Sequence, residues 1–136
     1  MANPLVSEGP VPFFVHGVIE YLAGVAFIAA PLVLDFPEGA STTLSIVLGV
    51  LILLIAATTE GPTGLIEGLA LTVHVVLDYV LALFLIAAPF LFSFSQEAVP
   101  TAFFIVFGIV HLLLTVGTRF MDAPRPSPES ERQQPS

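Results

Sequence analysis

Four long apolar stretches, separated by short segments with Pro, Gly and acidic residues, dominate the pattern of hydrophobic and polar positions. They cover residues 11–34, 41–57, 65–92 and 99–116. A helix needs about 20 apolar residues to cross the ~30 Å hydrocarbon core of a bilayer. Membrane β-strands would instead alternate apolar and polar residues over shorter segments. The pattern therefore predicts an all-α membrane protein with four transmembrane helices, the third of them tilted or beginning as a surface helix.

The second half of the chain resembles the first. A histidine, an acid four residues later and a tyrosine beside the acid recur 58 residues apart, as His16, Glu20, Tyr21 and His74, Asp78, Tyr79. Each copy then continues to an Ile-Ala-Ala-Pro segment, at residues 28–31 and 86–89. This predicts a tandem duplication of a two-helix unit. Because each unit has two spans, both copies insert with the same polarity, as a parallel repeat with a pseudo-twofold axis along the membrane normal.

The predicted organisation has four parts: an N-terminal tail (1–11), repeat 1 (12–60), repeat 2 (61–120) and a C-terminal tail (121–136). The C-terminal tail is rich in Pro, Ser, Glu and Gln, which have little to bury, so it is expected to be disordered.

The composition agrees with a lipid environment. Of the 136 residues, 56% are hydrophobic and 10% are charged, whereas soluble domains carry about 25% charged residues. The net charge of −8 disfavours nucleic acid as a partner. The chain has no cysteine, which excludes disulfides, thiolate metal sites and cysteine nucleophiles.

The few basic residues indicate an orientation. Arg119, Arg125 and Arg132 are the only Lys or Arg residues, and all follow the fourth stretch. Positively charged segments stay in the cytoplasm, so the C-terminus is expected there. Four spans place the N-terminus on the same side. The expected location is the plasma membrane, as a multi-pass protein.

The repeated histidines and acids are the main candidates for chemistry. Residues i and i+4 share one helix face, so His16 stacks beside Glu20 and His74 beside Asp78. If the predicted symmetry axis brings these faces together, the four side chains meet in one core. His111 has no histidine in the corresponding place, and it adds a third imidazole if it reaches them.

Several roles suit this cluster. The pairs could be structural, with each acid bonded to its own histidine and Tyr21 and Tyr79 as supporting polar groups. Two imidazoles and two carboxylates also form a ligand set for a divalent ion such as Zn²⁺ or Fe²⁺. The same groups could relay protons, because histidine titrates near neutral pH. His16 and His74 could instead ligate a b-type haem, which is the least favoured of the possible cofactors. The first expectation is that the cluster binds no cofactor.

Pro31 and Pro89 lie near the ends of the first and third stretches. A proline within a helix leaves the carbonyl four residues earlier without its usual partner and bends the helix. We expect each to kink and end its span, with a gating hinge as the alternative.

The spacing Gly64-x-x-x-Gly68, at the start of the third stretch, is typical of close helix packing within or between chains.

The duplicated two-helix unit resembles the SPW-repeat family of small bacterial and archaeal membrane proteins. In that family a Ser-Pro-Trp motif ends the first helix of the unit. The matching segments here are Ala30-Pro31-Leu32 and Ala88-Pro89-Phe90, in which only the proline is retained. The resemblance implies a plasma-membrane protein and carries no site residues of its own.

Two kinds of function follow from the sequence. The first is a non-enzymatic structural or accessory subunit that packs with a membrane protein or with a second copy of itself in the lipid bilayer. The alternative is a module that binds or transports protons or a divalent metal through the repeated pairs. Phosphate-binding loops, zincin motifs and Gly-x-Ser-x-Gly are all absent from the sequence, so an enzyme is not expected.

Overall fold

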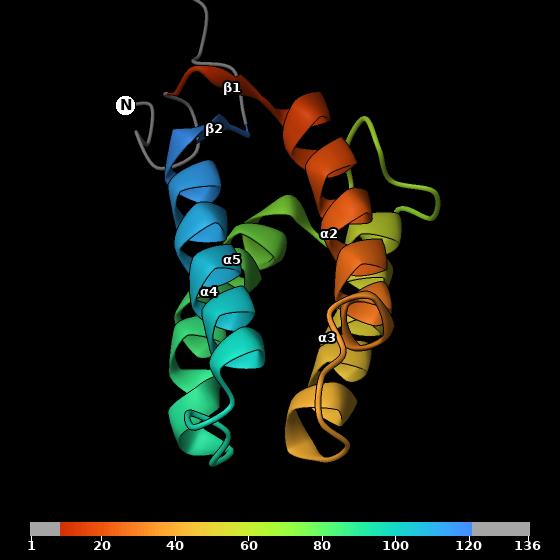
Figure 1. The fold of residues 1–136 in the computed structure, drawn as a ribbon. Coiled ribbons are helices and arrows are strands. Elements are labelled where there is room, and N and C mark those ends of the chain that lie inside the picture. Colours follow the sequence, from red (N-terminus) through yellow and green to blue (C-terminus); the bar gives the residue numbers. More distant parts are fainter. Residues whose placement is uncertain (1–8, 121–136) are drawn as a thin grey trace, which may run out of the picture.

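The computed structural model describes residues 9–120, and these form four helices: α2 (Phe13–Val33), α3 (Ala40–Thr58), α4 (Leu71–Leu91) and α5 (Ala98–Gly117). Two strands of two residues each, β1 (Val11–Pro12) and β2 (Thr118–Arg119), pair in parallel beside them. The helices run alternately down and up, so α2 and α4 begin at the same end (Figure 1). All four are long and apolar enough to cross a membrane. The prediction of an all-α protein with four spans is therefore confirmed.

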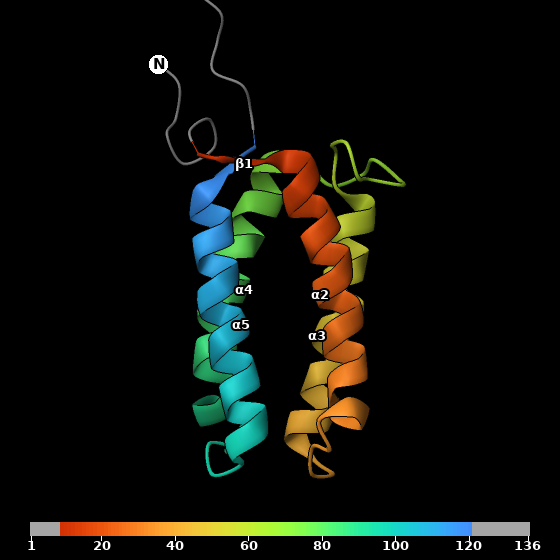
Figure 2. The same ribbon diagram turned by 45° about the horizontal axis from the view of Figure 1, so that its top comes forward.

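The helices pack as two hairpins, α2 with α3 and α4 with α5 (Figure 2). Small residues allow the backbones within each hairpin to approach closely. A Cβ atom on Gly49 would lie 2.7 Å from the carbonyl oxygen of Gly24, and one on Gly108 would lie 3.0 Å from that of Ala82. Such contacts are typical of membrane helices, which associate through tight packing rather than through burial from water.

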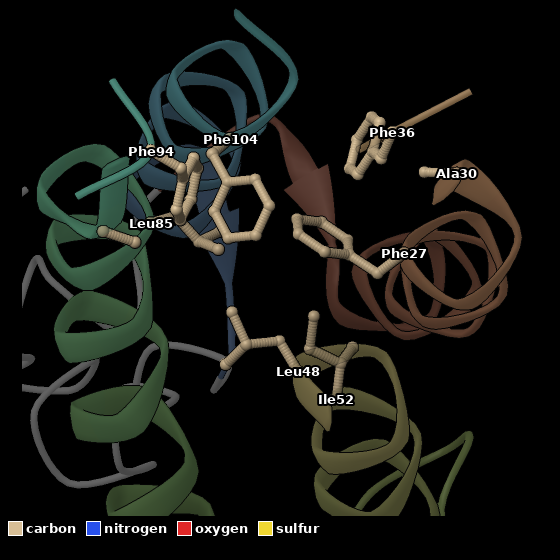
Figure 3. Close-up of a cluster of buried hydrophobic side chains, with 9 residues drawn as sticks. Phe27, Ala30, Phe36, Leu48, Ile52, Leu85, Phe94 and Phe104 are labelled. Carbon is tan, nitrogen blue, oxygen red and sulfur yellow. The ribbon is translucent and has the colours of Figure 1, made fainter. Parts of the chain in front are cut away.

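Large side chains fill the space between the two hairpins. The rings of Phe27 and Phe104 point into it from opposite sides, with their centroids 5.5 Å apart (Figure 3). Phe94 contacts Phe104 with a centroid distance of 5.1 Å. The buried members of this core are Phe27, Ala30, Phe36, Leu48, Ile52, Leu85, Ala88, Phe94 and Phe104. The aromatic core therefore lies between the two hairpins, and the two helices within each hairpin pack closely.

The outward faces of all four helices are also apolar. Leu22, Leu54, Leu83 and Leu113, one from each helix, are 57–67% exposed. A water-soluble protein of this size would not expose so much apolar surface. In a bilayer these side chains contact acyl chains, so the fold is that of a small multi-pass integral membrane protein.

Both prolines lie in the last turn of their helices. α2 ends two residues after Pro31, and α4 ends two residues after Pro89. The carbonyl of Phe27, which Pro31 cannot bond, accepts a hydrogen bond from the Ser45 hydroxyl at 2.6 Å. The neighbouring helix thus satisfies the polar group that the proline leaves free.

The expectation that the third span begins near residue 65 is wrong, because α4 starts at Leu71. The last carbonyls of α3 have no partner within their own helix. The backbone N–H groups of Leu65 and Ile66 bond to Ala57 at 2.8 and 2.9 Å, and that of Gly68 bonds to Thr58 at 2.9 Å. These bonds hold the segment as a loop. Gly64 and Gly68 consequently lie outside any helix and pack no helix pair.

Two short parallel pairings lie outside the helices. β1 joins β2 with Val11 opposite Thr118, and the loop between α3 and α4 forms a bridge between Thr59 and Leu69. Leu69 follows Val11 by 58 residues, and Thr118 follows Thr59 by 59. The predicted C-terminal tail (121–136) and most of the N-terminal tail (1–11) lie outside the described residues.

Candidate metal site

The two repeated pairs meet at one end of the bundle. His16 is the fourth residue of α2 and His74 is the fourth residue of α4. Glu20 and Asp78 follow one turn later on the same faces. All four side chains are buried, with exposed fractions between 0 and 4%. Their arrangement follows from the parallel course of α2 and α4, which brings the first turns of both helices to the same end.

The four side chains converge on a common centre. Asp78 Oδ2 lies 3.1 Å from His16 Nε2 and 3.0 Å from His74 Nε2. Glu20 Oε1 lies 3.5 and 3.2 Å from the same two nitrogens. The ligand atoms of all four residues lie within 4.8 Å of one another. Each acid therefore faces both histidines, not only the histidine of its own helix.

This ring of distances matches the size of a metal site. Four atoms joined by edges of 3.0–3.5 Å surround a point about 2.0–2.4 Å from each of them, close to the ~2.0–2.2 Å of Zn–N and Zn–O bonds. A cation at this point would lie against two imidazole nitrogens and two carboxylate oxygens.

The charges of the donor set favour a divalent cation. Two ionised carboxylates carry two negative charges, which a divalent ion neutralises, so the loaded cluster has no net charge in a low-dielectric core. Imidazole nitrogen suits zinc, iron, nickel and copper, whereas Mg²⁺ and Ca²⁺ prefer oxygen ligands. The residues present thus fit a divalent transition metal.

His111 reaches the cluster from α5. Its Nε2 lies 3.4 Å from Asp78 Oδ1, whereas His16 and His74 face the other oxygen, Oδ2. Its ring centroid is 6.2 Å from that of His16. His111 and Glu20 also line a cavity of about 20 Å³ between the hairpins, which has room for one water molecule. The third imidazole is therefore placed to orient Asp78 rather than to replace a ligand.

A family model described as SPW repeat domain matches residues 14–118 of this chain. The chain belongs to the SPW repeat family. The resemblance drawn from the Pro31 and Pro89 segments is thereby confirmed. No curated protein and no solved structure matches it.

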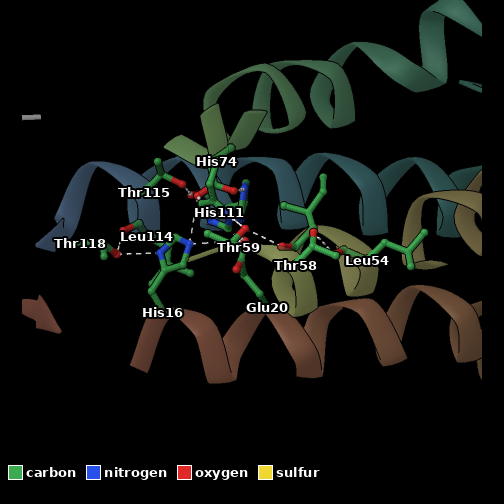
Figure 4. A network of polar contacts seen from close by, with 12 residues as sticks. His16, Glu20, Leu54, Thr58, Thr59, His74, His111, Leu114, Thr115 and Thr118 are labelled. Atoms are coloured by element: carbon green, nitrogen blue, oxygen red, sulfur yellow. Dashed lines mark hydrogen bonds and ion pairs between the residues drawn. The ribbon is translucent and has the colours of Figure 1, made fainter. Parts of the chain in front are cut away.

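Threonines hold the outer nitrogens of both imidazoles in this SPW repeat protein. His16 Nδ1 lies 2.8 Å from the Thr118 hydroxyl, and His74 Nδ1 lies 2.7 Å from the Thr59 hydroxyl (Figure 4). Both threonines are almost fully buried, at 0 and 3% exposed. Neither threonine was predicted from the sequence. The available signal was their spacing of 59 residues, since each threonine immediately follows its helix, Thr59 after α3 and Thr118 after α5.

Two aromatic rings cover the outer side of the imidazoles. Phe120 contacts His16 with ring centroids 4.9 Å apart, and Phe13 lies 6.3 Å from His16 and 6.2 Å from His74. Phe13 and Phe120 also contact each other at 5.3 Å. This apolar cover separates the polar cluster from the end of the bundle.

The hydroxyls of the two tyrosines expected to support the cluster make no hydrogen bond to it within the described residues. The Tyr21 hydroxyl donates a hydrogen bond to the carbonyl of Thr63 at 2.8 Å, in the loop before α4. The Tyr79 hydroxyl is buried and has no hydrogen-bond partner within residues 9–120. The polar support of the site comes from Thr59, Thr118 and His111 instead.

Haem does not fit between His16 and His74. A porphyrin ring would have to pass through the space between the two Nε2 atoms, and Glu20 and Asp78 each have an oxygen within 3.5 Å of both. The adjoining cavity of about 20 Å³ is far smaller than a macrocycle. The geometry therefore suits an ion and not a planar cofactor.

Proposed function

We propose that this protein binds one divalent transition-metal ion inside the membrane through His16, Glu20, His74 and Asp78. The observation that carries the proposal is the closed ring of N···O distances of 3.0–3.5 Å among four buried side chains. A purely structural arrangement needs only one acid for each histidine. Contacts in which each acid faces both imidazoles are instead expected when all four side chains bind one central ion.

The role we propose is binding or transfer of the ion rather than catalysis. Asp78 and Glu20 are both in contact with the two imidazoles, and the adjoining cavity holds no more than a water molecule. This leaves no room for an organic substrate beside the ion.

We infer further that the chain is a tandem duplication, inserted in the plasma membrane with both termini in the cytoplasm. Paired backbone bonds support the duplication: Phe36 bonds to Pro31 at 3.0 Å, and Phe94 bonds to Pro89 at 2.9 Å. Arg119, beside the site end of the bundle, supports the orientation. On this orientation the metal lies near the cytoplasmic face.

A titration of the purified protein in detergent with Zn²⁺ tests the proposal. We expect one ion per chain, measured by calorimetry and by metal analysis after desalting. The double variant Glu20→Gln with Asp78→Asn removes both charges at nearly constant size. It should weaken binding more than about 100-fold, beyond the range for outer-sphere residues.

A matched control uses the same two changes away from the cluster. Asp35 and Glu38 are exposed in the loop between α2 and α3, so Asp35→Asn with Glu38→Gln should bind zinc like the unaltered protein. Equal binding by the two double variants would refute the metal site.

The second candidate is an accessory subunit that associates with another membrane protein or with a second copy. It is favoured by an apolar groove of about 250 Å³ between α3 and α4, whose lining residues are Leu48, Leu51, Ile55, Leu77, Val80, Leu81 and Phe84. Chemical cross-linking in membranes, followed by mass spectrometry, separates a specific partner from lipid alone.

A further inference from the structure

The hydrogen bonds of Thr59 and Thr118 determine which nitrogen of each histidine carries a proton. The Thr118 hydroxyl donates to the carbonyl of Leu114 at 2.6 Å. The Thr59 hydroxyl donates to the carbonyl of Ile55, also at 2.6 Å. A hydroxyl group has a single hydrogen. Each threonine hydroxyl therefore donates its single hydrogen to a carbonyl of the helix that precedes it. Its oxygen can face the histidine only as an acceptor.

The imidazoles must consequently donate through Nδ1. His16 Nδ1–H donates to Thr118, and His74 Nδ1–H donates to Thr59, at 2.8 and 2.7 Å. A neutral imidazole that holds its proton on Nδ1 presents a lone pair on Nε2. Both Nε2 atoms face the centre of the ring formed with Glu20 and Asp78. The outer bond to a hydrogen-bond partner is also what orients histidine ligands in metal proteins.

We propose that Thr59 and Thr118 are positioning residues that fix the tautomer and ring orientation of His74 and His16 for metal binding. The proposal rests on the metal site proposed above, but its tautomer part can be tested without any metal. Each threonine contacts a histidine of the other predicted repeat: Thr59, in repeat 1, contacts His74, and Thr118, in repeat 2, contacts His16. The two-helix units are thus joined through the outer sphere of the site.

The short pairings hold both threonines in place. Thr118 lies in β2 opposite Val11, and Thr59 forms the bridge with Leu69. Each threonine therefore has its hydroxyl tied to the end of one helix and its backbone tied to the segment that leads into the helix of its histidine. Little freedom remains for the imidazole to turn its Nε2 away.

Replacement of each threonine by valine tests the proposal, since valine keeps the shape and removes the acceptor. Thr59→Val and Thr118→Val should each weaken Zn²⁺ binding about 10–100-fold, the range measured for outer-sphere partners. Thr59→Ser and Thr118→Ser keep the hydroxyl, so each should bind Zn²⁺ with an affinity within a few-fold of the unaltered protein. The matched control is Thr58→Val, because the Thr58 hydroxyl makes the same helix bond, to Leu54 at 2.7 Å, where that bond is exposed.

Nitrogen-15 NMR of histidine-labelled protein provides the second readout, without metal. Nδ1 of His16 and His74 should carry a proton, and the valine variants should lose this preference at the affected ring. Valine variants that bind zinc like the unaltered protein, or an Nδ1 without a proton in the metal-free protein, would overturn the proposal. Failure of the unaltered protein to bind zinc would instead overturn the metal site, and the NMR result would still decide the tautomer.

Discussion

At the scale of single residues, the two carboxylates of the site are not equivalent. Asp78 faces His16 and His74 through Oδ2 and His111 through Oδ1. Glu20 lacks a third imidazole, because the residue that matches His111 in the first half of the chain is the buried Ile52. A ligating carboxylate is more precisely oriented when its second oxygen has a partner. His111 therefore strengthens one side of an otherwise symmetric cluster.

The replacement His111→Ile installs the residue found at the matching position. Zinc affinity should fall about 10-fold, at the lower end of the outer-sphere range. Asp78 loses its contact with His111 but keeps its contacts with His16 and His74. Calorimetric titration checks this, with thermal unfolding as a control for folding. Unchanged affinity in a folded variant would mean that His111 does not act on the site.

At the scale of elements, the loop between α3 and α4 positions one half of the site. It begins with Thr59, which holds His74, and rests on α2 through Thr63, whose carbonyl accepts the Tyr21 hydroxyl. A Cβ on Gly17 would collide with the Thr63 side chain. The close approach of the loop to α2, one residue from His16, thus requires glycine at this position.

The variant Gly17→Val should displace this loop. The collision with Thr63 should cost about 1–3 kcal/mol of stability, as for other overpacked sites, and should weaken zinc binding because Thr59 moves with the loop. Unfolding in mixed detergent micelles measures the stability. Gly68→Val in the same loop is the control, since nothing lies within 4 Å of a Cβ there. Equal effects of the two changes would contradict the proposed contact.

At the scale of the whole molecule, the site and both ends of the described chain lie together. β1 leads into α2 and β2 follows α5, and their pairing closes the bundle at the end that holds the histidines. Phe13 and Phe120 cover the cluster at the same end. The loops after α2 and after α4 lie at the opposite end (Figures 1 and 2). The fold therefore has one polar, closed end and one end formed by simple turns.

Cysteine labelling can test the orientation, because the chain contains no cysteine of its own. Glu38→Cys and Gln96→Cys, at exposed positions of the two turns, should react with an impermeant maleimide in intact cells. Glu67→Cys, in the loop at the site end, should react only after permeabilisation. The reverse pattern would place the site at the outer face and contradict the proposed orientation.

The sequence by itself determined the class of the protein and the composition of its most polar faces. Long runs of apolar residues leave only helices as spanning elements, because lipid offers no hydrogen bonds to the backbone. The i, i+4 spacing places His16 with Glu20, and His74 with Asp78, on one face of a helix. The i, i+4 pairing depends only on spacing within one helix and not on how the helices pack.

Only the tertiary structure decided which polar groups meet. Leu65 and Ile66 look like the start of a span, yet their N–H groups bond to the open end of α3. Thr118 reaches His16 from 102 residues away, and His111 joins from α5. Such partners depend on helix approach and loop path, which hydrophobic periodicity does not encode. The pattern of apolar stretches thus predicts a four-helix membrane protein, and packing between distant segments forms its candidate metal site.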